Sequence, residues 1–202
     1  MNRFPLLRLG LIWLIMAGFG LSAAQALTFS TVILDAGHGG HDGGAAWHGL
    51  VEKRLCLDVA QRVERILKAK GVRVVMTRRS DVFVELDNRA RIANRYLKSV
   101  FVSIHFNANR KTSITGMEGY YRSSRGKILA ASILRSMDRR VTGTNRGVFN
   151  RNFKVLRSTL MPAAVIECGY LSNRTEAKRC ASPSHRQAIA EGIAAGILAT
   201  RG

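Results

Sequence analysis

Three separate apolar runs in this chain each lead to a residue that can bind a metal or transfer a proton. The run VILDAGH stops at His38, FVSIHFN contains His105 and AVIECGY contains Glu167. Short apolar runs of this kind are typical of buried strands. In an α/β domain the carboxyl ends of such strands share one edge of the sheet, where these folds build their sites. The sequence therefore predicts that three residues far apart in the chain meet at one edge.

Apolar runs and stretches with helical periodicity alternate along the chain. Strands are expected at 31–36, 72–77, 99–105, 117–122, 153–157 and 163–168, and helices from Glu52 to Gly71 and at about 85–97, 126–141 and 184–200. This order predicts a single α/β domain, with a mostly parallel or mixed sheet of about six strands and helices on both faces. The pairing of the 117–122 strand stays open, and an antiparallel place in a mixed sheet is one alternative.

The first 26 residues have the pattern of an export signal. Arg3 and Arg8 give a positive start, an apolar run from Leu9 to Leu21 follows, and Ala24-Gln25-Ala26 offers a cleavage site. A spanning helix needs roughly 20 apolar residues, so a retained membrane anchor is the less favoured alternative. We expect residues 1–26 to be a signal peptide and residues 27–202 to form one domain.

The chain is strongly basic, with 32 Lys and Arg against 13 Asp and Glu and a formal net charge of +19. These charges are scattered over the whole chain, which favours an acidic polymer as partner, although a solvated face that keeps the protein soluble is the alternative. Only 7% of the residues are aromatic and no nucleic-acid motif is present, so we expect no nucleic-acid partner. Three cysteines are too few for a disulfide scaffold, and a pairing of Cys168 with Cys180 stays open.

His38 lies in a glycine-rich loop that follows the first apolar run. The loop reads DAGHGGHDGG and has neither the Lys-Ser/Thr ending of a phosphate-binding loop nor the dinucleotide pattern. Glycine lets such a loop turn tightly and leaves space around a ligand. His38 is closest to the strand and is the better ligand candidate, whereas we expect His41 and His48 to be loop histidines.

Two acidic residues complete the candidate site. Glu52 opens a predicted helix, where the helix dipole favours a carboxylate in any case. Glu167 lies in an apolar run, where a carboxylate is costly to bury without a cation, a metal or a chemical task. Two histidines and a carboxylate are the ligands that a catalytic Zn²⁺ needs, and a second carboxylate can act as the base. Glu167 is the candidate base, although the residues alone do not separate ligand from base among Glu52, Glu167 and Asp35.

In this order the motifs resemble those of the zinc-dependent N-acetylmuramoyl-L-alanine amidases of the bacterial cell wall. The resemblance extends from about Thr31 to Ala199 and rests on ILDAGHGGHDGGA, Glu52 with Lys53, MTRRSD, then Leu86, Arg89, Ala93 and Asn94, FVSIHFNAN, NRGV, FKVLR, MPAAVIECGYLSN and Glu176. It implies Zn²⁺ ligands at His38, Glu52 and His105 and a catalytic glutamate at Glu167. It also implies hydrolysis of the amide between the lactyl group of muramic acid and the first residue of the peptide stem.

The chain departs from the family's pattern beside the site. Asp42-Gly43-Gly44 stands where similar proteins often have Asp-Pro-Gly, and Gly169-Tyr170 where they often have Gly-Phe. Some members insert a long helical segment before the catalytic glutamate, and this segment covers the metal until an activator moves it. Here we expect two strands and one helix to use up the chain between His105 and Glu167, which leaves the site open to solvent.

The resemblance also implies peptidoglycan as the acidic polymer partner and an exported enzyme. The expected location is the periplasm if the host is Gram-negative, and otherwise the medium or the cell wall. We expect a monomer that is not inserted in a membrane after signal cleavage, and the sequence identifies no activator protein. Two alternatives remain, a wall-binding module that keeps the fold without turnover and a secreted cationic nucleic-acid binder.

Overall fold

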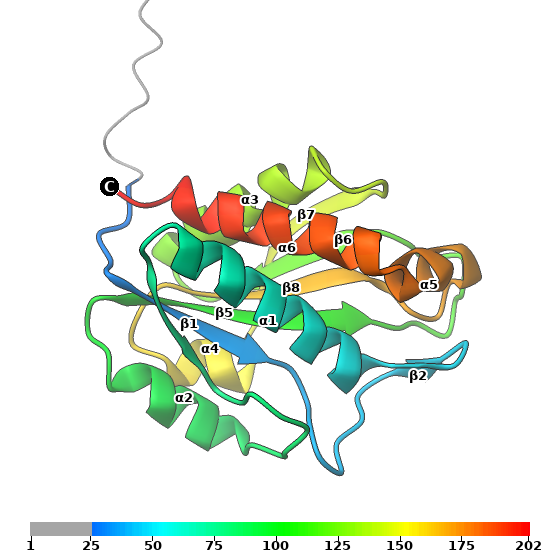
Figure 1. Ribbon diagram of the computed structural model, residues 1–202, viewed down its shortest axis with the longest axis horizontal. Helices are drawn as coiled ribbons and strands as arrows, with labels where there is room; N and C mark the ends of the chain where they lie inside the picture. The colour runs from blue at the N-terminus through cyan, green and yellow to red at the C-terminus, as the bar shows by residue number, and fades with distance from the viewer. Residues whose placement is uncertain (1–25) are drawn as a thin grey trace, which may run out of the picture.

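The computed structural model describes residues 26–202, which form one mixed six-stranded sheet flanked by helices (Figure 1). The strands, in their order across the sheet, are β4 (Arg73–Met76), β1 (Thr31–Ala36), β5 (Ser99–Asn107), β8 (Ala163–Tyr170), β6 (Met117–Tyr121) and β7 (Asn145–Asn150). Strands β4, β1, β5 and β8 run parallel to one another. Strand β6 is antiparallel to β8 and parallel to β7. The predicted α/β class is confirmed, and the alternative of an antiparallel β6 is the correct one.

Helices cover both faces of the sheet. They are α1 (Glu52–Ala69), α2 (Leu86–Asn94), α3 (Ser124–Asp138), α4 (Lys154–Ser158), α5 (Arg174–Ala181) and α6 (Pro183–Leu198), and a small hairpin joins β2 (Ala46–Trp47) to β3 (Leu50–Val51). Figure 1 shows α1, α3 and α6 together on one face and α2 with α4 on the other. The chain thus has the three-layer arrangement that a sheet buried on both sides requires.

Side chains that alternate along β1 contribute to two separate hydrophobic cores, one on each face of the sheet. Val32 and Leu34 pack into the cluster under α1, α3 and α6, whereas Ile33 packs into the cluster under α2 and α4. Successive side chains of a strand point to opposite faces, so a strand covered on both sides reads as a continuous apolar run. This is why the sequence reveals β1, β5 and β8 clearly.

Three elements differ from the sequence-based prediction. The stretch 153–157 is not a strand, because residues 154–157 form most of the short helix α4, in which the adjacent residues Val155 and Leu156 are both buried. A short apolar run does not distinguish the two states. Strand β7 was not predicted because it lies at the sheet edge, contains Gly147 and is only partly buried. Because α4 is a helix, two strands and two helices, not one helix, separate His105 from Glu167, and helix α5, which follows β8, was also not predicted.

The predicted signal peptide lies almost wholly outside the described residues. None of the helices formed by residues 26–202 combines the length and apolar character needed to cross a bilayer. The cysteines Cys56, Cys168 and Cys180 are all buried free thiols, so the structure contains no disulfide between Cys168 and Cys180. They pack as small core residues.

Candidate active site

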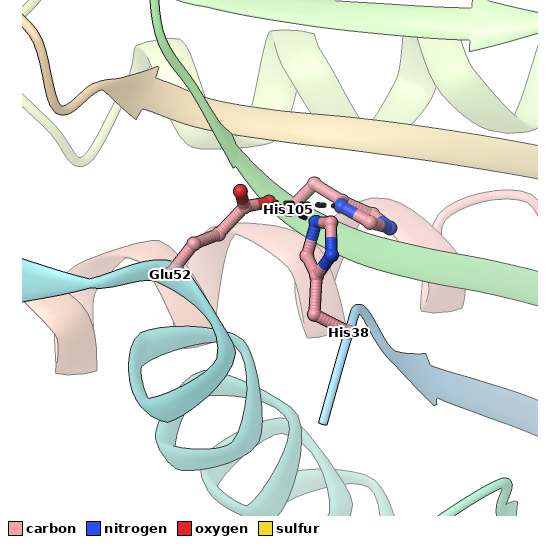
Figure 2. A group of neighbouring side chains, drawn as sticks. All are labelled: His38, Glu52 and His105. Carbon is pink, nitrogen blue, oxygen red and sulfur yellow. Dashed lines mark hydrogen bonds and ion pairs between the residues drawn. The ribbon is translucent and has the colours of Figure 1, made fainter. Parts of the chain in front are cut away.

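His38, Glu52 and His105 meet at the carboxyl edge of the sheet (Figure 2). His38 follows β1, Glu52 is the first residue of α1, and His105 lies near the end of β5. Glu52 Oε1 lies 3.0 Å from His38 Nε2 and 2.9 Å from His105 Nδ1. One donor atom from each side chain falls within 4.8 Å of the other two. The structure therefore brings these three predicted ligand residues together.

Glycines make this close approach of side chains possible. A Cβ at Gly37 would lie 2.3 Å from His105 Cε1, and a Cβ at Gly44 would lie 2.5 Å from Glu52 Oε2. Gly44 has a φ of 66°, and His38 itself has a φ of 58°, which is uncommon for a residue with a side chain. The glycine-rich loop thus supplies the space that the sequence predicted, and its turn aims the His38 ring at Glu52.

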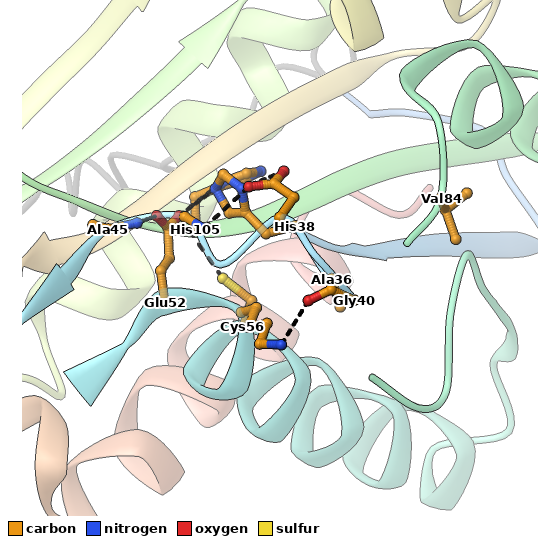
Figure 3. Close-up of polar contacts among 12 residues, drawn as sticks. Ala36, His38, Gly40, Ala45, Glu52, Cys56, Val84 and His105 are labelled. Carbon is orange, nitrogen blue, oxygen red and sulfur yellow. Dashed lines mark hydrogen bonds and ion pairs between the residues drawn. The ribbon is translucent and has the colours of Figure 1, made fainter. Parts of the chain in front are cut away.

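Further hydrogen bonds hold the three side chains in place (Figure 3). Asp42 Oδ2 lies 2.8 Å from His38 Nδ1, so His38 presents its Nε2 atom to the cluster. The backbone N–H of Ala45 donates to Glu52 Oε2 at 2.8 Å, and that of Phe106 donates to Glu52 Oε1 at 3.1 Å. This second layer of contacts fixes ring and carboxylate orientation, as in protein metal sites.

The charges in this cluster are strongly coupled. Burial alone would raise the pKa of Glu52, but hydrogen bonds from His105 and His38 hold it well below its usual value. Burial alone would lower the pKa of His105, whereas its hydrogen bond to Glu52 and the nearby carboxylate of Glu167 raise it to about 9. The buried carboxylate of Glu52 therefore stays ionised and attracts positive charge to this point.

Glu167 lies in β8 directly opposite His105 of β5 in the parallel register. Its Oε2 atom is buried and has no hydrogen-bond partner among the described residues. Burial raises the pKa of Glu167 to about 7, and the carboxylate of Glu52 adds to this effect while the positive charge of His105 opposes it. A carboxyl group with this pKa can take up and release a proton near neutral pH.

The structure resolves the role of Asp35, which the sequence left open as a ligand or base. Its buried carboxylate accepts hydrogen bonds from Thr77 at 2.6 Å, Ser103 at 2.6 Å and Arg89 at 2.8 Å. Burial would raise the pKa of Asp35, but the Arg89 guanidinium and these hydrogen bonds lower it. Asp35 is thus a buried anchor between strands and helix α2, and it lies outside the His38, Glu52 and His105 group.

His41 and His48 lie in turns, as predicted. The ring of His41 stacks on Phe83 with centroids 4.1 Å apart, and His48 Nε2 lies 3.3 Å from the carbonyl oxygen of Ser172. Neither belongs to the group that could hold a metal.

Glu118 is a further buried carboxylate beside the site, and the sequence did not single it out. It pairs with Glu167 across the antiparallel strands β6 and β8 and raises the pKa of Glu167 through charge repulsion. The hydroxyls of Tyr120 and Tyr170 and the guanidinium of Arg146 donate hydrogen bonds to it. Its position between apolar residues in the run MEGYY is the same signal that identified Glu167.

A cavity of about 470 Å³ opens over these groups. Its walls include His38, Glu52, His105 and Glu167, and the two histidine side chains remain 23% and 21% exposed. Among the described elements that lie wholly between β5 and β8, α3 packs with α6 on the face that α1 also covers, and only the short α4 contributes to the cavity wall. The cavity is therefore accessible from solvent, in agreement with the expectation of an uncovered site.

Comparison with known proteins identifies relatives of the whole domain. Residues 32–199 match the sequence profile of a family described as N-acetylmuramoyl-L-alanine amidase. The probable cell wall amidase LytH of Staphylococcus saprophyticus is 34% identical over 179 residues, which cover 87% of this chain and 60% of that protein. This chain therefore spans less than two thirds of the length of LytH. The uncharacterized protein YqiI of Bacillus subtilis is also 34% identical, over 87% of this chain and 86% of its own length.

Solved structures show the same fold. The N-acetylmuramoyl-L-alanine amidase AmiC2 of Nostoc punctiforme superposes with a TM-score of 0.81 at 41% sequence identity, over 84% of this chain and 95% of AmiC2.

Proposed function

Because this chain belongs to the N-acetylmuramoyl-L-alanine amidase family, we propose that it hydrolyses the amide bond between N-acetylmuramic acid and L-alanine in peptidoglycan. Such cleavage would serve cell-wall remodelling, daughter-cell separation or lysis. The observation that carries the proposal is the convergence of His38, Glu52 and His105 next to a buried Glu167 carboxylate oxygen that has no hydrogen-bond partner among the described residues.

We propose that His38, Glu52 and His105 hold a Zn²⁺ ion. Two imidazole nitrogens and one carboxylate oxygen are the donor set of catalytic zinc sites, which keep one position free. The ionised state of Glu52 and the contacts of His38 with Asp42 fit this task, because zinc ligands need a deprotonated donor and an oriented ring. When bound, the ion supplies a Lewis acid that polarises the substrate carbonyl and makes water a better nucleophile.

Glu167 is the proposed acid–base residue. Its free Oε2 oxygen accepts a proton from the attacking water and passes it to the nitrogen of the departing L-alanine. The β8 backbone fixes this carboxylate opposite His105, and the surrounding apolar residues limit access of bulk water to it. Glu118 and its tyrosine partners keep a second negative charge beside Glu167, which favours the protonated form that the departing amine requires.

We propose that residues 1–26 direct export and that residues 27–202 are the catalytic domain. The enzyme would then act in the periplasm of a Gram-negative host, or otherwise outside the cell or in its wall. The surplus of Lys and Arg gives the domain a basic surface, which would hold the acidic groups of peptidoglycan by electrostatic attraction. Binding to purified sacculi should therefore weaken steeply as salt is added.

Mass spectrometry of peptidoglycan treated with the purified protein tests the reaction. The proposal requires stem peptides with a free L-alanine amine, released from intact glycan strands. A chelator should abolish the release and added Zn²⁺ should restore it, with one metal per chain in elemental analysis. Products cut within the glycan or inside the stem would contradict the proposed bond.

The Glu167→Gln variant separates the acid–base role from metal binding. It should retain its metal and lose about 10²- to 10⁴-fold in turnover, which is the usual contribution of a positioned acid–base group. Unchanged turnover would remove Glu167 from the mechanism. A His105→Ala variant is the complementary case, because it should lose both metal and turnover.

A further inference from the structure

Two cavities meet at the histidine pair of the site. The first is the cavity of about 470 Å³ described above, here called the Glu167 cavity. The second, of about 360 Å³, is called the Phe83 cavity and is lined by Phe83 and Val84. Both cavities share four lining residues, which are His38, His105, Leu86 and Val155. Leu86 and Val155 thus stand between two compartments on either side of the reacting centre.

The position of Glu167 indicates which part of the substrate each cavity holds, and this step rests on the proposed function. Glu167 lines the first cavity and not the second. A proton donor must lie within hydrogen-bond reach of the group that it protonates. The departing amine, and the peptide attached to it, therefore lie in the Glu167 cavity. The muramoyl side then extends toward the Phe83 cavity, where Phe83 offers an apolar face to a sugar ring.

Lys154 is the single Lys or Arg among the described residues that line the Glu167 cavity. It begins helix α4, its side chain is 36% exposed, and its Nζ lies 2.8 Å from Asp87 Oδ1. The Asp87 side chain is 63% exposed, and ion pairs at such exposed positions are weak. A carboxylate from a bound ligand can therefore replace Asp87 as the partner of Lys154 at little cost.

We propose that Lys154 binds a carboxylate on the second residue of the stem peptide and so makes this enzyme prefer stems that carry a free acid there over stems that carry a carboxamide. Glu167 and Lys154 line the same cavity of about 470 Å³, and two extended residues reach roughly 7 Å from the cleaved amide. The other ionisable groups of this cavity are acidic or belong to the histidine cluster. Lys154 is thus the group that compensates a negative charge on the peptide side.

Binding of soluble muramoyl peptides to the inactive Glu167→Gln protein tests the proposal directly. Two ligands are compared, which differ only in having a carboxylate or a carboxamide on the second stem residue. With Lys154 present, the carboxylate ligand should bind about fivefold to tenfold more tightly. Adding Lys154→Gln should abolish this preference because it weakens binding of the carboxylate ligand alone. Adding Lys154→Arg should retain the preference.

The matched control is Lys127→Gln, which removes the same charge from an exposed position on α3, away from both cavities. It should leave the preference intact. In the active enzyme, Lys154→Gln should raise KM for the carboxylate substrate and leave kcat unchanged. Equal losses for both ligands, or the same effect from Lys127→Gln, would overturn the proposal. Absence of turnover by the unmodified protein would instead overturn the proposed function.

Discussion

Asp35 on β1 and Glu167 on β8 are two buried carboxylates on the strands that flank β5, and they have opposite surroundings. Asp35 receives hydrogen bonds on both oxygens from Thr77, Ser103 and Arg89, whereas Glu167 Oε2 has no partner among the described residues. The pKa of Asp35 is lowered, and that of Glu167 is raised to about 7. The first carboxylate therefore stays ionised near neutral pH, and the second can exchange a proton there.

Two carboxylates of the same sheet thus differ in what they can do: one is held in place by its partners, and the other is left without them. A buried charge with all its partners stabilises the fold around it, whereas a buried carboxyl without a partner costs free energy unless a ligand or a reaction uses it. Perturbed groups of the second kind gather at functional sites. The number of hydrogen-bond partners, more than the degree of burial, distinguishes the two carboxylates.

The largest expected difference in stability follows substitution of the supporting carboxylate. Asp35→Asn leaves the Arg89 guanidinium buried without its counter-charge and should lower the free energy of unfolding by about 3–5 kcal/mol. Urea denaturation would measure this loss. Asp87→Asn is the control, because its pair with Lys154 is exposed and should contribute less than about 1 kcal/mol. Similar losses in the two variants would show that Asp35 is not the anchor inferred here.

The two carboxylates should also give opposite pH dependence of stability in metal-free protein. The pKa of Glu167 rises from 4.5 to about 7 on folding, so the folded state holds a proton that the unfolded state releases, and stability falls as pH rises through this interval. The expected loss is about 3 kcal/mol. Asp35 acts in the other direction, because its lowered pKa gives stability above 3.8 that is lost as pH falls further.

Urea denaturation at pH 4.5 and pH 8 would reveal the Glu167 effect. Glu167→Gln removes the titrating group, so this variant should gain stability relative to the unmodified protein as pH rises. A difference between the two proteins that does not change with pH would contradict the raised pKa of Glu167.

The close contact between Gly37 and the His105 ring predicts a variant that loses turnover without losing the fold. In Gly37→Ala the new Cβ would lie 2.3 Å from His105 Cε1, so the ring must move. Misplacement of a site residue by about 1 Å costs roughly 10²-fold in rate. Gly43→Ala lies in the same loop, but its Cβ would meet Val51 Cγ1 at an ordinary 3.6 Å, so activity should be nearly unchanged. Equal peptidoglycan hydrolysis by both variants would count against this packing.

The sequence predicts most of the fold and predicts that the four candidate site residues lie at one edge of the sheet, but it does not distinguish Asp35 from Glu167. Strands β1, β5 and β8 are apolar on both faces, and this makes their ends easy to locate. Asp35 and Glu167 both lie in such runs. Their difference depends on side chains from distant segments, such as Arg89 on α2, which a pattern of apolar residues does not reveal.

The elements that were missed have weaker local signals. Helix α4 is only five residues long and its apolar pair Val155 and Leu156 suits a strand equally well. Helix α5 is polar, although the Asn173 side chain accepts a hydrogen bond from the Glu176 N–H, and an Asn followed three residues later by Glu marks a helix start. That capping signal was available in the sequence, whereas the buried network around Glu118 depends on tertiary contacts.

The smallest expected loss of stability follows when Asp35 is deprived of one hydrogen-bond partner, so that one of its oxygens is left unpartnered like Glu167 Oε2. Ser103 is the sole described side-chain partner of Asp35 Oδ2, whereas Oδ1 is shared by Thr77 and Arg89. Ser103→Ala should therefore leave one buried oxygen unpartnered, raise the pKa of Asp35 and lower the free energy of unfolding by about 2 kcal/mol. Thr77→Val should cost less, because Arg89 still binds Oδ1. If thermal or urea denaturation gives the opposite order for the two variants, the number of partners on each oxygen does not explain why the pKa of Asp35 is lowered while that of Glu167 is raised.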